Sequence, residues 1–236
     1  MLTLLVRPAA FEHAPLRVVW ISGASDPRAC GLSDAQAALL RACAADDSVA
    51  TNFPFVAGRP AREVPLWIAS LSNLVQFLSA STPLFRWAAA RHWRALCASS
   101  ERVLVIAGSC GAQLLRALER ATPPGVEVRA IALGPVAWRA PACLEVALVG
   151  ERDRIARPFV RAGGGARVVS VPGVGHMDYL ASELVLGAVR GWVRAHMESW
   201  SASRAAPTAR ATVAAMASAR QASIDASSAT SSWAAR

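Results

Sequence analysis

Short apolar runs alternate along this chain with longer segments whose apolar residues recur at helical spacing. Such runs, bounded by turn residues, are typical of strands, and strands that alternate with helices form mostly parallel sheets. The run at 103–107 (VLVIA) is apolar throughout, which predicts a strand inside the sheet, covered on both faces. The pattern predicts an α/β fold, a mostly parallel sheet with crossover helices on both faces. Strands are expected at 17–21, 103–107, 128–133, 144–149 and 167–171.

The remaining segments are predicted from helical spacing and from proline positions. Helices are expected at 33–45, at 111–120 and from about 178 to 196, and a further strand at 49–56 with an irregular end at Pro54. Pro83 separates two helices between 65 and 99, because proline ends one helix and starts the next. Most of their large apolar residues are expected to be core or helix contacts, although the aromatic ones could line an acyl pocket. These residues are Trp67, Leu71, Leu74, Leu78, Phe85, Trp87 and Trp93.

The chain divides by composition into one domain, 1–198, and an Ala/Ser/Arg-rich tail, 199–236. The tail has too little apolar surface to offset its ordering entropy, so we expect it to be mostly disordered or weakly helical. No apolar run reaches the eighteen or so residues of a transmembrane helix. The start, MLTLLVRP, is interrupted too early for a signal peptide, which predicts an edge strand and a cytoplasmic protein.

The net charge of +9 does not predict nucleic-acid binding. All 25 basic residues are arginines, and they are scattered along the chain rather than gathered in a stripe with aromatic residues. The five cysteines have no C-x-x-C spacing, so neither a disulfide framework nor a zinc site is indicated. No metal and no cofactor are expected, and the histidines His13, His92 and His196 are expected at the surface.

Three local sequences indicate chemistry because each follows a predicted strand. The first, 107–112 (AGSCGA), lies between a strand and a helix, where a nucleophile needs very small neighbours two residues away. The second, 150–153, places Asp153 where a carboxylate can orient a histidine, or alternatively cap the following helix. The third, 173–176, places His176 on a glycine-rich loop, as suits a general base. Glu151 and Asp178 are the alternative acids.

Two residues compete for the role of nucleophile. Ser109 has Ala107 and Gly111 two residues away on either side, whereas Cys110 has two equally small neighbours. Ser109 fits the end of the predicted strand, and Cys110 would need the strand to be one residue longer. Ser109 is therefore the predicted nucleophile, and Cys110 is the alternative, because a thiolate paired with histidine is a good nucleophile.

With these motifs in the order nucleophile, acid, histidine, the chain resembles the α/β-hydrolase superfamily over 17–196. GERDRIARP looks like its acid loop and VPGVGHMDYL like its histidine loop, while RVVWISGA is similar to its oxyanion strand and turn, with Ser22 where the family often carries His. The resemblance implies that the backbone N–H groups of Ala24 and Cys110 form the oxyanion hole. The chain departs from the pattern at Ala107, where the family usually has glycine, and in its shortened N-terminal part.

The expected activity is acyl transfer from a small-molecule substrate to water, with Ser109, Asp153 and His176 as the triad. A carboxylic ester is the first choice of substrate. A thioesterase or acyltransferase, with an acyl carrier as partner, is the alternative, and homodimer formation stays open. A rival class is a binding protein that kept the fold without the chemistry. The connection 134–143 is too short to carry a large lid, so any cap over the site must come from 65–99.

Overall fold

The computed structural model describes residues 8, 10–26, 31–43, 49, 51–54, 64–160 and 165–204. Contacts between residues divide the chain into two units, residues 1–193 and residues 194–236. The first unit carries the sheet and every predicted site residue. In the second unit, residues 194–204 are helical. The predicted tail begins at 199, so its first described residues, 199–204, are helical, and the rest of it lies outside the described residues, as do residues 1–7.

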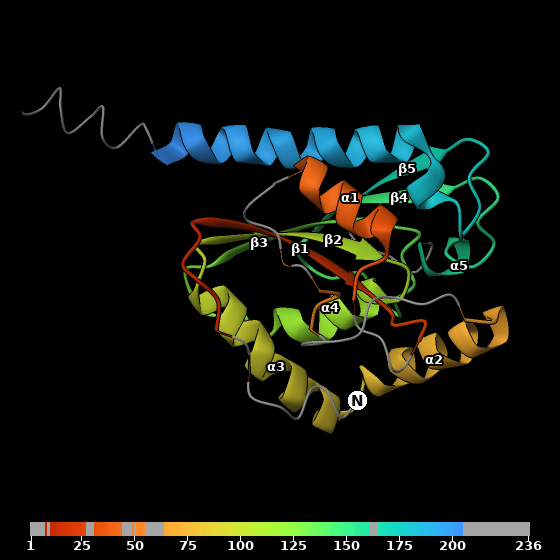
Figure 1. Ribbon diagram of the computed structural model, residues 1–236, viewed down its shortest axis with the longest axis horizontal. Coiled ribbons are helices and arrows are strands. Elements are labelled where there is room, and N and C mark those ends of the chain that lie inside the picture. The colour runs from red at the N-terminus through yellow and green to blue at the C-terminus, as the bar shows by residue number, and fades with distance from the viewer. Residues whose placement is uncertain are drawn as a thin grey trace, which may run out of the picture. The chain divides into compact units, whose positions relative to one another are not determined.

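The first unit is built on one sheet of five parallel strands. Their order in the sheet follows their order in the chain, and each strand is parallel to its neighbours (Figure 1). β1 and β2 are buried along their whole length, as expected of strands covered on both faces. The five predicted strands that surround the motifs are confirmed. Their bounds are β1 Leu16–Ser22, β2 Arg102–Gly108, β3 Glu127–Leu133, β4 Leu144–Gly150 and β5 Arg167–Val171.

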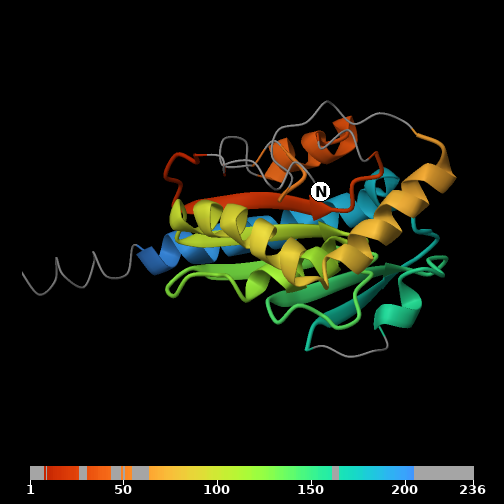
Figure 2. The ribbon, with the colours of Figure 1, turned by 90° about the horizontal axis from the view of Figure 1, so that it is seen from below.

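Helices cover both faces of this sheet, as predicted. α1 packs on β1 from one face, and α4 packs on β1 and β2 from the other, with α3 against α4 (Figures 1 and 2). Residues 183–193 are helical and bury Val185, Val189 and Val193. The connection 134–143 contains no helix, in agreement with its predicted shortness. The named helices are α1 Asp34–Cys43, α2 Leu66–Ser79, α3 Pro83–Ala98, α4 Gly111–Glu119 and α5 Arg157–Val160.

Capping groups explain where two of these helices begin. The Ser33 hydroxyl accepts from the Gln36 N–H, and the Gln36 side chain accepts from the Ser33 N–H, which is a capping box before α1. The Thr82 hydroxyl accepts from the Phe85 N–H, and Pro83 occupies the first position of α3. The sequence Ser81-Thr82-Pro83 therefore separates α2 from α3, as predicted.

The strand predicted at 49–56 is not regular within the part of it that the structure describes. Val49 and Phe53 donate backbone hydrogen bonds to Val18 and Trp20 of β1, so the segment follows the free edge of β1. Thr51 forms only an isolated bridge to Gly31, and Pro54 has no N–H with which to continue a ladder. Residues 50, 55 and 56 lie outside the described residues.

Burial corrects two predictions about side chains. His92 was expected at the surface, but it is buried in α3. Of the apolar residues expected in the core, Phe85 and Trp93 are buried, whereas the other five are more than half exposed. The exposed five are Trp67, Leu71, Leu74, Leu78 and Trp87. Among the described residues no helix is both long and apolar enough to cross a bilayer.

Candidate active site

Ser109 sits on a sharp turn between the end of β2 and the start of α4. Its φ of 49° makes it the only non-glycine residue with a positive φ in the described part of the chain. This left-handed conformation is strained for a residue with a side chain, so surrounding bonds must hold it. The Ser109 N–H donates to the Leu133 carbonyl over 2.9 Å, and the Ser109 carbonyl accepts from the Val136 N–H over 3.0 Å. The strand that follows in the chain thus holds the turn.

The small neighbours of Ser109 have unequal importance. A Cβ on Gly111 would lie 2.0 Å from the Ile21 carbonyl oxygen, which belongs to the backbone of β1 and cannot move aside. Glycine is therefore required at this position. Ala107 is fully buried, and its methyl group is accommodated on the other side of the turn. The departure from the family pattern at Ala107 consequently leaves the turn intact.

His176 connects Ser109 to Asp153. The Ser109 Oγ lies 2.9 Å from His176 Nε2, and His176 Nδ1 lies 2.9 Å from Asp153 Oδ2. The three side chains come from the loops after β2, β4 and β5, which end at the same edge of the parallel sheet. The structure thus brings together the three residues that the sequence singled out.

Asp153 is fully buried, and hydrogen bonds surround its carboxylate. Burial by itself would raise the pKa of this group, but donors from the Ala156 backbone, the Tyr179 hydroxyl and His176 outweigh it and hold the pKa below the usual value. Oδ1 accepts from the N–H groups of Ile155 and Ala156, both over 2.9 Å. Asp153 therefore caps the turn before α5 with one oxygen and contacts His176 with the other.

This environment sets the tautomer of His176. An ionised carboxylate only accepts hydrogen bonds, so the hydrogen of the His176–Asp153 contact is on Nδ1. In the neutral imidazole the Nε2 lone pair then faces the Ser109 hydroxyl, which can donate to it. Such an arrangement is what proton transfer from the serine requires.

The two alternative acids bind elsewhere. Glu151 accepts from the Gly173 N–H over 3.2 Å, and Asp178 accepts from the Gly175 N–H over 2.9 Å. Both carboxylates thus brace the glycine-rich loop that precedes His176. Asp153 is the carboxylate that contacts the imidazole.

Cys110 does not share the geometry of Ser109. Its thiol is buried, 3.9 Å from the Asn73 side-chain oxygen. Burial raises the pKa of this thiol to about 11, so very little thiolate exists at neutral pH. The backbone of Cys110 forms the N-cap position of α4, where N–H groups and the helix dipole favour an anion.

The Ala24 N–H, the other expected oxyanion donor, already has an acceptor. It donates to Gln76 Oε1 over 2.7 Å, and Gln76 Nε2 donates back to the Ala24 carbonyl over 2.8 Å. Ser72 also donates to this carbonyl, over 2.6 Å. In this structure α2 therefore holds the turn after β1 by both backbone polar groups of Ala24.

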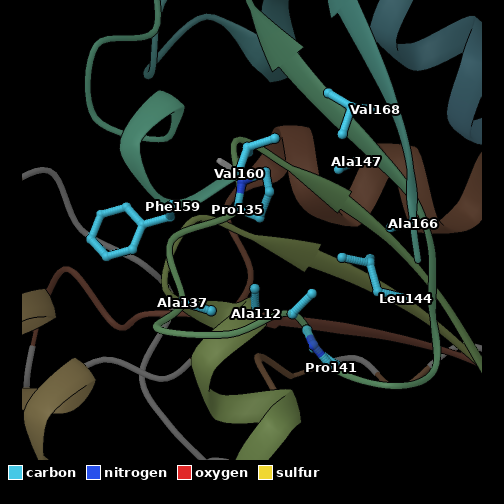
Figure 3. A pocket seen from close by; sticks show the side chains of 11 residues that line it. Ala112, Pro135, Ala137, Pro141, Leu144, Ala147, Phe159, Val160, Ala166 and Val168 are labelled. Atoms are coloured by element: carbon cyan, nitrogen blue, oxygen red, sulfur yellow. The ribbon is translucent and has the colours of Figure 1, made fainter. Parts of the chain in front are cut away.

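A cavity of about 200 Å³ opens beside Ser109 and His176. Its walls include Trp20, Leu133, Tyr179 and Leu180, together with the polar side chains of Ser22, Ser25, Gln36 and Asn73. A second cavity, of about 30 Å³, lies near the connection 134–143 and is lined by apolar side chains such as Leu144 and Val168 (Figure 3). The first cavity is the candidate substrate site, because Ser109 and His176 both line it.

Sequence reasoning missed three residues that support the site. Tyr179 donates to Asp153 Oδ2 over 2.7 Å and accepts from the Gly150 N–H over 2.8 Å. Asn52 accepts from the Ser22 N–H and donates to the Ser22 carbonyl, and Gln76 binds Ala24. Of these three, only Tyr179 could have been found from the sequence, because it lies within the predicted histidine loop, three residues after His176. Among the described residues, no group of three His, Cys, Asp or Glu side chains could hold a metal ion.

A comparison with one solved structure agrees with this fold. No protein-family model and no curated protein sequence matches the chain. Among solved structures, the chain is similar to a predicted CIB-like hydrolase from Thermoplasma acidophilum, with a TM-score of 0.50 and 14% identity over 75% of this chain and 86% of that one. It is also similar to a dienelactone hydrolase from Anabaena variabilis, with a TM-score of 0.46 and 12% identity over 78% of this chain and 85% of that one. For a thermophilic esterase from Thermogutta terrifontis the TM-score is 0.43 and the identity 13%, over 78% of this chain and 91% of that one.

The parallel sheet, the strained serine turn and the placement of the three motif loops define the class of this protein. The chain has an α/β-hydrolase-like fold, and the resemblance found in the sequence is confirmed at the level of the fold. At 14% identity the comparison shows the fold alone, so the chemistry must be argued from the site itself.

Proposed function

We propose that this protein is a serine hydrolase that cleaves a carboxylic ester through an acyl-enzyme intermediate. The observation that carries the proposal is the 2.9 Å contact between the Ser109 hydroxyl, on its strained turn, and His176 Nε2. A serine hydroxyl is a weak nucleophile unless a base removes its proton as it attacks. His176 is in position to do so, and Asp153 fixes the tautomer that makes Nε2 the base.

The first half of the reaction forms the acyl-enzyme. His176 Nε2 takes the proton of the Ser109 hydroxyl while Oγ bonds to the ester carbonyl carbon, giving a tetrahedral oxyanion. The carbonyl re-forms, the bond to the alcohol oxygen breaks, and His176 gives its proton to that oxygen. The positive charge that His176 carries in between lies beside the ionised Asp153, which stabilises it.

The second half releases the acid. A water molecule gives a proton to His176 Nε2 and attacks the acyl carbon, and the second tetrahedral oxyanion then collapses. The bond to Ser109 Oγ breaks, and Oγ recovers its proton from His176. The products are a carboxylic acid and an alcohol, and the enzyme returns to its starting state.

The oxyanion is proposed to bind at the N-terminus of α4. The Cys110 N–H is next to the attacking oxygen, and the helix dipole adds favourable potential there. The Ala24 N–H remains the predicted second donor. It can serve only after the Gln76 amide releases it, because Gln76 Oε1 is its present acceptor.

The cavity favours a small substrate with an apolar acyl or alcohol group. At about 200 Å³ it is smaller than the 300–1,000 Å³ that is usual for drug-sized ligands. Trp20, Leu133 and Leu180 give it apolar walls. Thioester cleavage, acyl transfer to another acceptor, an acyl-carrier partner, a homodimer and a cytoplasmic location stay predictions from the sequence. The two intact side-chain contacts that join Ser109, His176 and Asp153 argue against a binding protein that lost its chemistry.

Steady-state hydrolysis of p-nitrophenyl esters with increasing acyl length tests this function. Wild type should show saturable turnover that declines for long acyl chains. Ser109→Ala and His176→Ala should each lower kcat by at least roughly four orders of magnitude. His13→Ala is the matched control and should behave like wild type, because His13 is exposed and precedes β1, whereas the motif loops follow the opposite ends of the parallel strands. Wild-type turnover in Ser109→Ala would contradict the proposal.

A further inference from the structure

Helix α2 carries its apolar side chains on the outside. The large side chains at 67, 71, 74, 75 and 78 form one stripe along the helix, since these positions are three, four or seven residues apart. An amphipathic helix normally turns such a stripe toward the core. Here each side chain in the stripe is between 52 and 67% exposed. The stripe consists of Trp67, Leu71, Leu74, Val75 and Leu78.

The opposite face of α2 explains this orientation. Ser72 and Gln76 bind the backbone of Ala24, and Asn73 contacts the Cys110 thiol. These three polar residues share the side of the helix that faces the turn after β1. Rotating α2 to bury its leucines would break the bonds to Ala24, so the apolar stripe is held outward by the same contacts that shape the site.

Further exposed apolar side chains lie on α3 and in the connection 134–143. Leu84 and Trp87, in the first turns of α3, are 55 and 57% exposed. Trp138 is 58% exposed and packs against Phe77 of α2, with ring centroids 5.2 Å apart. We call the α2 stripe, together with these residues of α3 and Trp138, the outer apolar surface. Large exposed apolar side chains gathered on consecutive elements of a folded protein indicate an interaction site.

The charge next to this surface has one sign. Residues 64–100, which include α2 and α3, contain three arginines and no acidic residue. A shallow groove of about 350 Å³ beside Trp87 is lined by Arg86, Arg94 and Arg120, and no carboxylate contributes to its lining. Trp87 itself stacks under the Arg91 guanidinium, 5.3 Å from the ring centroid. The exposed Trp87 thus lines a groove that suits anionic phosphates.

We propose that the outer apolar surface is a docking site for an anionic lipid bilayer. The apolar stripe of α2 inserts among the acyl chains at the headgroup boundary, and the arginine groove receives lipid phosphates. Tryptophan and arginine suit this interface, because each combines an apolar body with a polar or charged group. The inference goes beyond the proposed hydrolysis, and Ser109 plays no part in it.

The charge distribution favours a bilayer over a second copy of the chain. Two copies meeting through this surface would bring the arginines of both α3 helices close together, with no carboxylate from 64–100 to neutralise them. An anionic bilayer supplies that charge. Because Asn73 of α2 also lines the cavity of Ser109, docking places the cavity near the membrane surface.

Vesicle flotation of the full chain tests the proposal. Wild type and Ser109→Ala should both float with vesicles of phosphatidylcholine and phosphatidylglycerol, much less with phosphatidylcholine alone, and less at high salt. Leu71→Gln/Leu74→Gln/Leu78→Gln should lower binding by at least about tenfold. Glutamine suits a helix nearly as well as leucine, so α2 should persist. Exchanging Arg86, Arg94 and Arg120 for glutamine should lower binding to the anionic vesicles by about fivefold for each arginine.

The matched control is Leu184→Gln/Val168→Thr, which alters exposed apolar side chains outside the outer apolar surface and should bind like wild type. Far-ultraviolet circular dichroism and the Tm check that every variant is folded, including the inactive Ser109→Ala. Absence of wild-type flotation overturns the proposal, as does unchanged flotation of the triple leucine variant. A wild-type dimer in light scattering, dissociated by the leucine exchanges and unable to float, would assign the surface to a second copy instead.

Discussion

Tyr179 is expected to hold Asp153 in place, and replacing it with phenylalanine isolates that role. The exchange keeps the ring and removes only the hydroxyl, which donates to Asp153 Oδ2 over 2.7 Å and accepts from the Gly150 N–H over 2.8 Å. Tyr179 is 5% exposed, so water cannot easily take its place. The variant therefore loses one bond to a charged group and leaves one buried N–H without its acceptor.

The size of both effects follows from these bonds. A hydrogen bond to a charged group contributes roughly 1.5–3 kcal/mol, and an unsatisfied buried donor costs roughly 1–3 kcal/mol. We expect Tyr179→Phe to lower the free energy of unfolding by about 3 kcal/mol. Asp153 keeps its bonds from Ile155, Ala156 and His176, so it stays ionised. The kcat should fall by about tenfold, which corresponds to roughly 1.4 kcal/mol of lost transition-state stabilisation, while KM stays nearly constant.

The acid side of the stability profile gives a second readout. The pKa of Asp153 is lowered in the folded state, so its contribution to stability is present above the unfolded pKa of about 4 and is lost as pH falls through the folded pKa. Without the Tyr179 hydroxyl the folded pKa rises toward the unfolded value. The contribution becomes smaller and is lost at higher pH, so the variant should unfold at a higher pH than wild type.

Urea unfolding at pH values from about 3 to about 7 measures the free energy of unfolding and the pH of the acid transition. Ester kinetics measure kcat. Val189→Ala is the control, since it shortens a fully buried side chain and destabilises the fold while every hydrogen-bond partner of Asp153 stays in place. A Tyr179→Phe variant with the kcat of Val189→Ala and an unshifted acid transition would refute the role of Tyr179.

Three further exchanges test other parts of the site. Gly111→Ala should cost at least about 3 kcal/mol or prevent folding, because the new Cβ would lie 2.0 Å from the Ile21 carbonyl oxygen; a wild-type Tm would contradict the close approach of the turn to β1. Iodoacetamide should alkylate native Cys110 slowly at pH 7 and leave activity intact, since a pKa of about 11 leaves roughly one thiolate in ten thousand; rapid alkylation with loss of activity would contradict this. Asp153→Asn should keep the fold while kcat falls by about 10⁴, because the amide favours the wrong tautomer of His176; near-wild-type turnover would exclude Asp153 as the orienting group.

The sequence predicted the strands that lie within the sheet and are covered on both faces. β1 and β2 are buried on both faces, and continuous apolar runs are the direct consequence of that burial. The segment at 49–56 was predicted as a strand, but among its described residues Val49 and Phe53 bond to β1 without forming a regular ladder. The irregular end expected at Pro54 agrees with the missing N–H of proline. A segment beside the edge of a sheet can have the composition of a strand although it lacks the hydrogen-bonding partners of a strand.

The side chains of α2 show where sequence reasoning fails for a physical reason. Its apolar stripe fits a helix packed on a core, but Ser72 and Gln76 bind the Ala24 backbone and turn the stripe outward. Such contacts join residues about fifty positions apart, and no local pattern reveals them. The order of Ser109, Asp153 and His176 was readable because each follows a strand end. Their supporting residues Asn52 and Gln76 were not, since they lie on segments whose placement depends on the folded sheet.

Covalent labelling with a fluorophosphonate tests the central claim most directly. The intact protein should gain one adduct, and peptide mass spectrometry should locate it on Ser109. Ser109→Ala should take up no label, whereas Cys110→Ala should be labelled like wild type, because alanine supplies the same backbone N–H. A folded wild-type protein that stays unlabelled, an adduct on Cys110, or undiminished labelling of Ser109→Ala would contradict the assignment of Ser109 as the nucleophile.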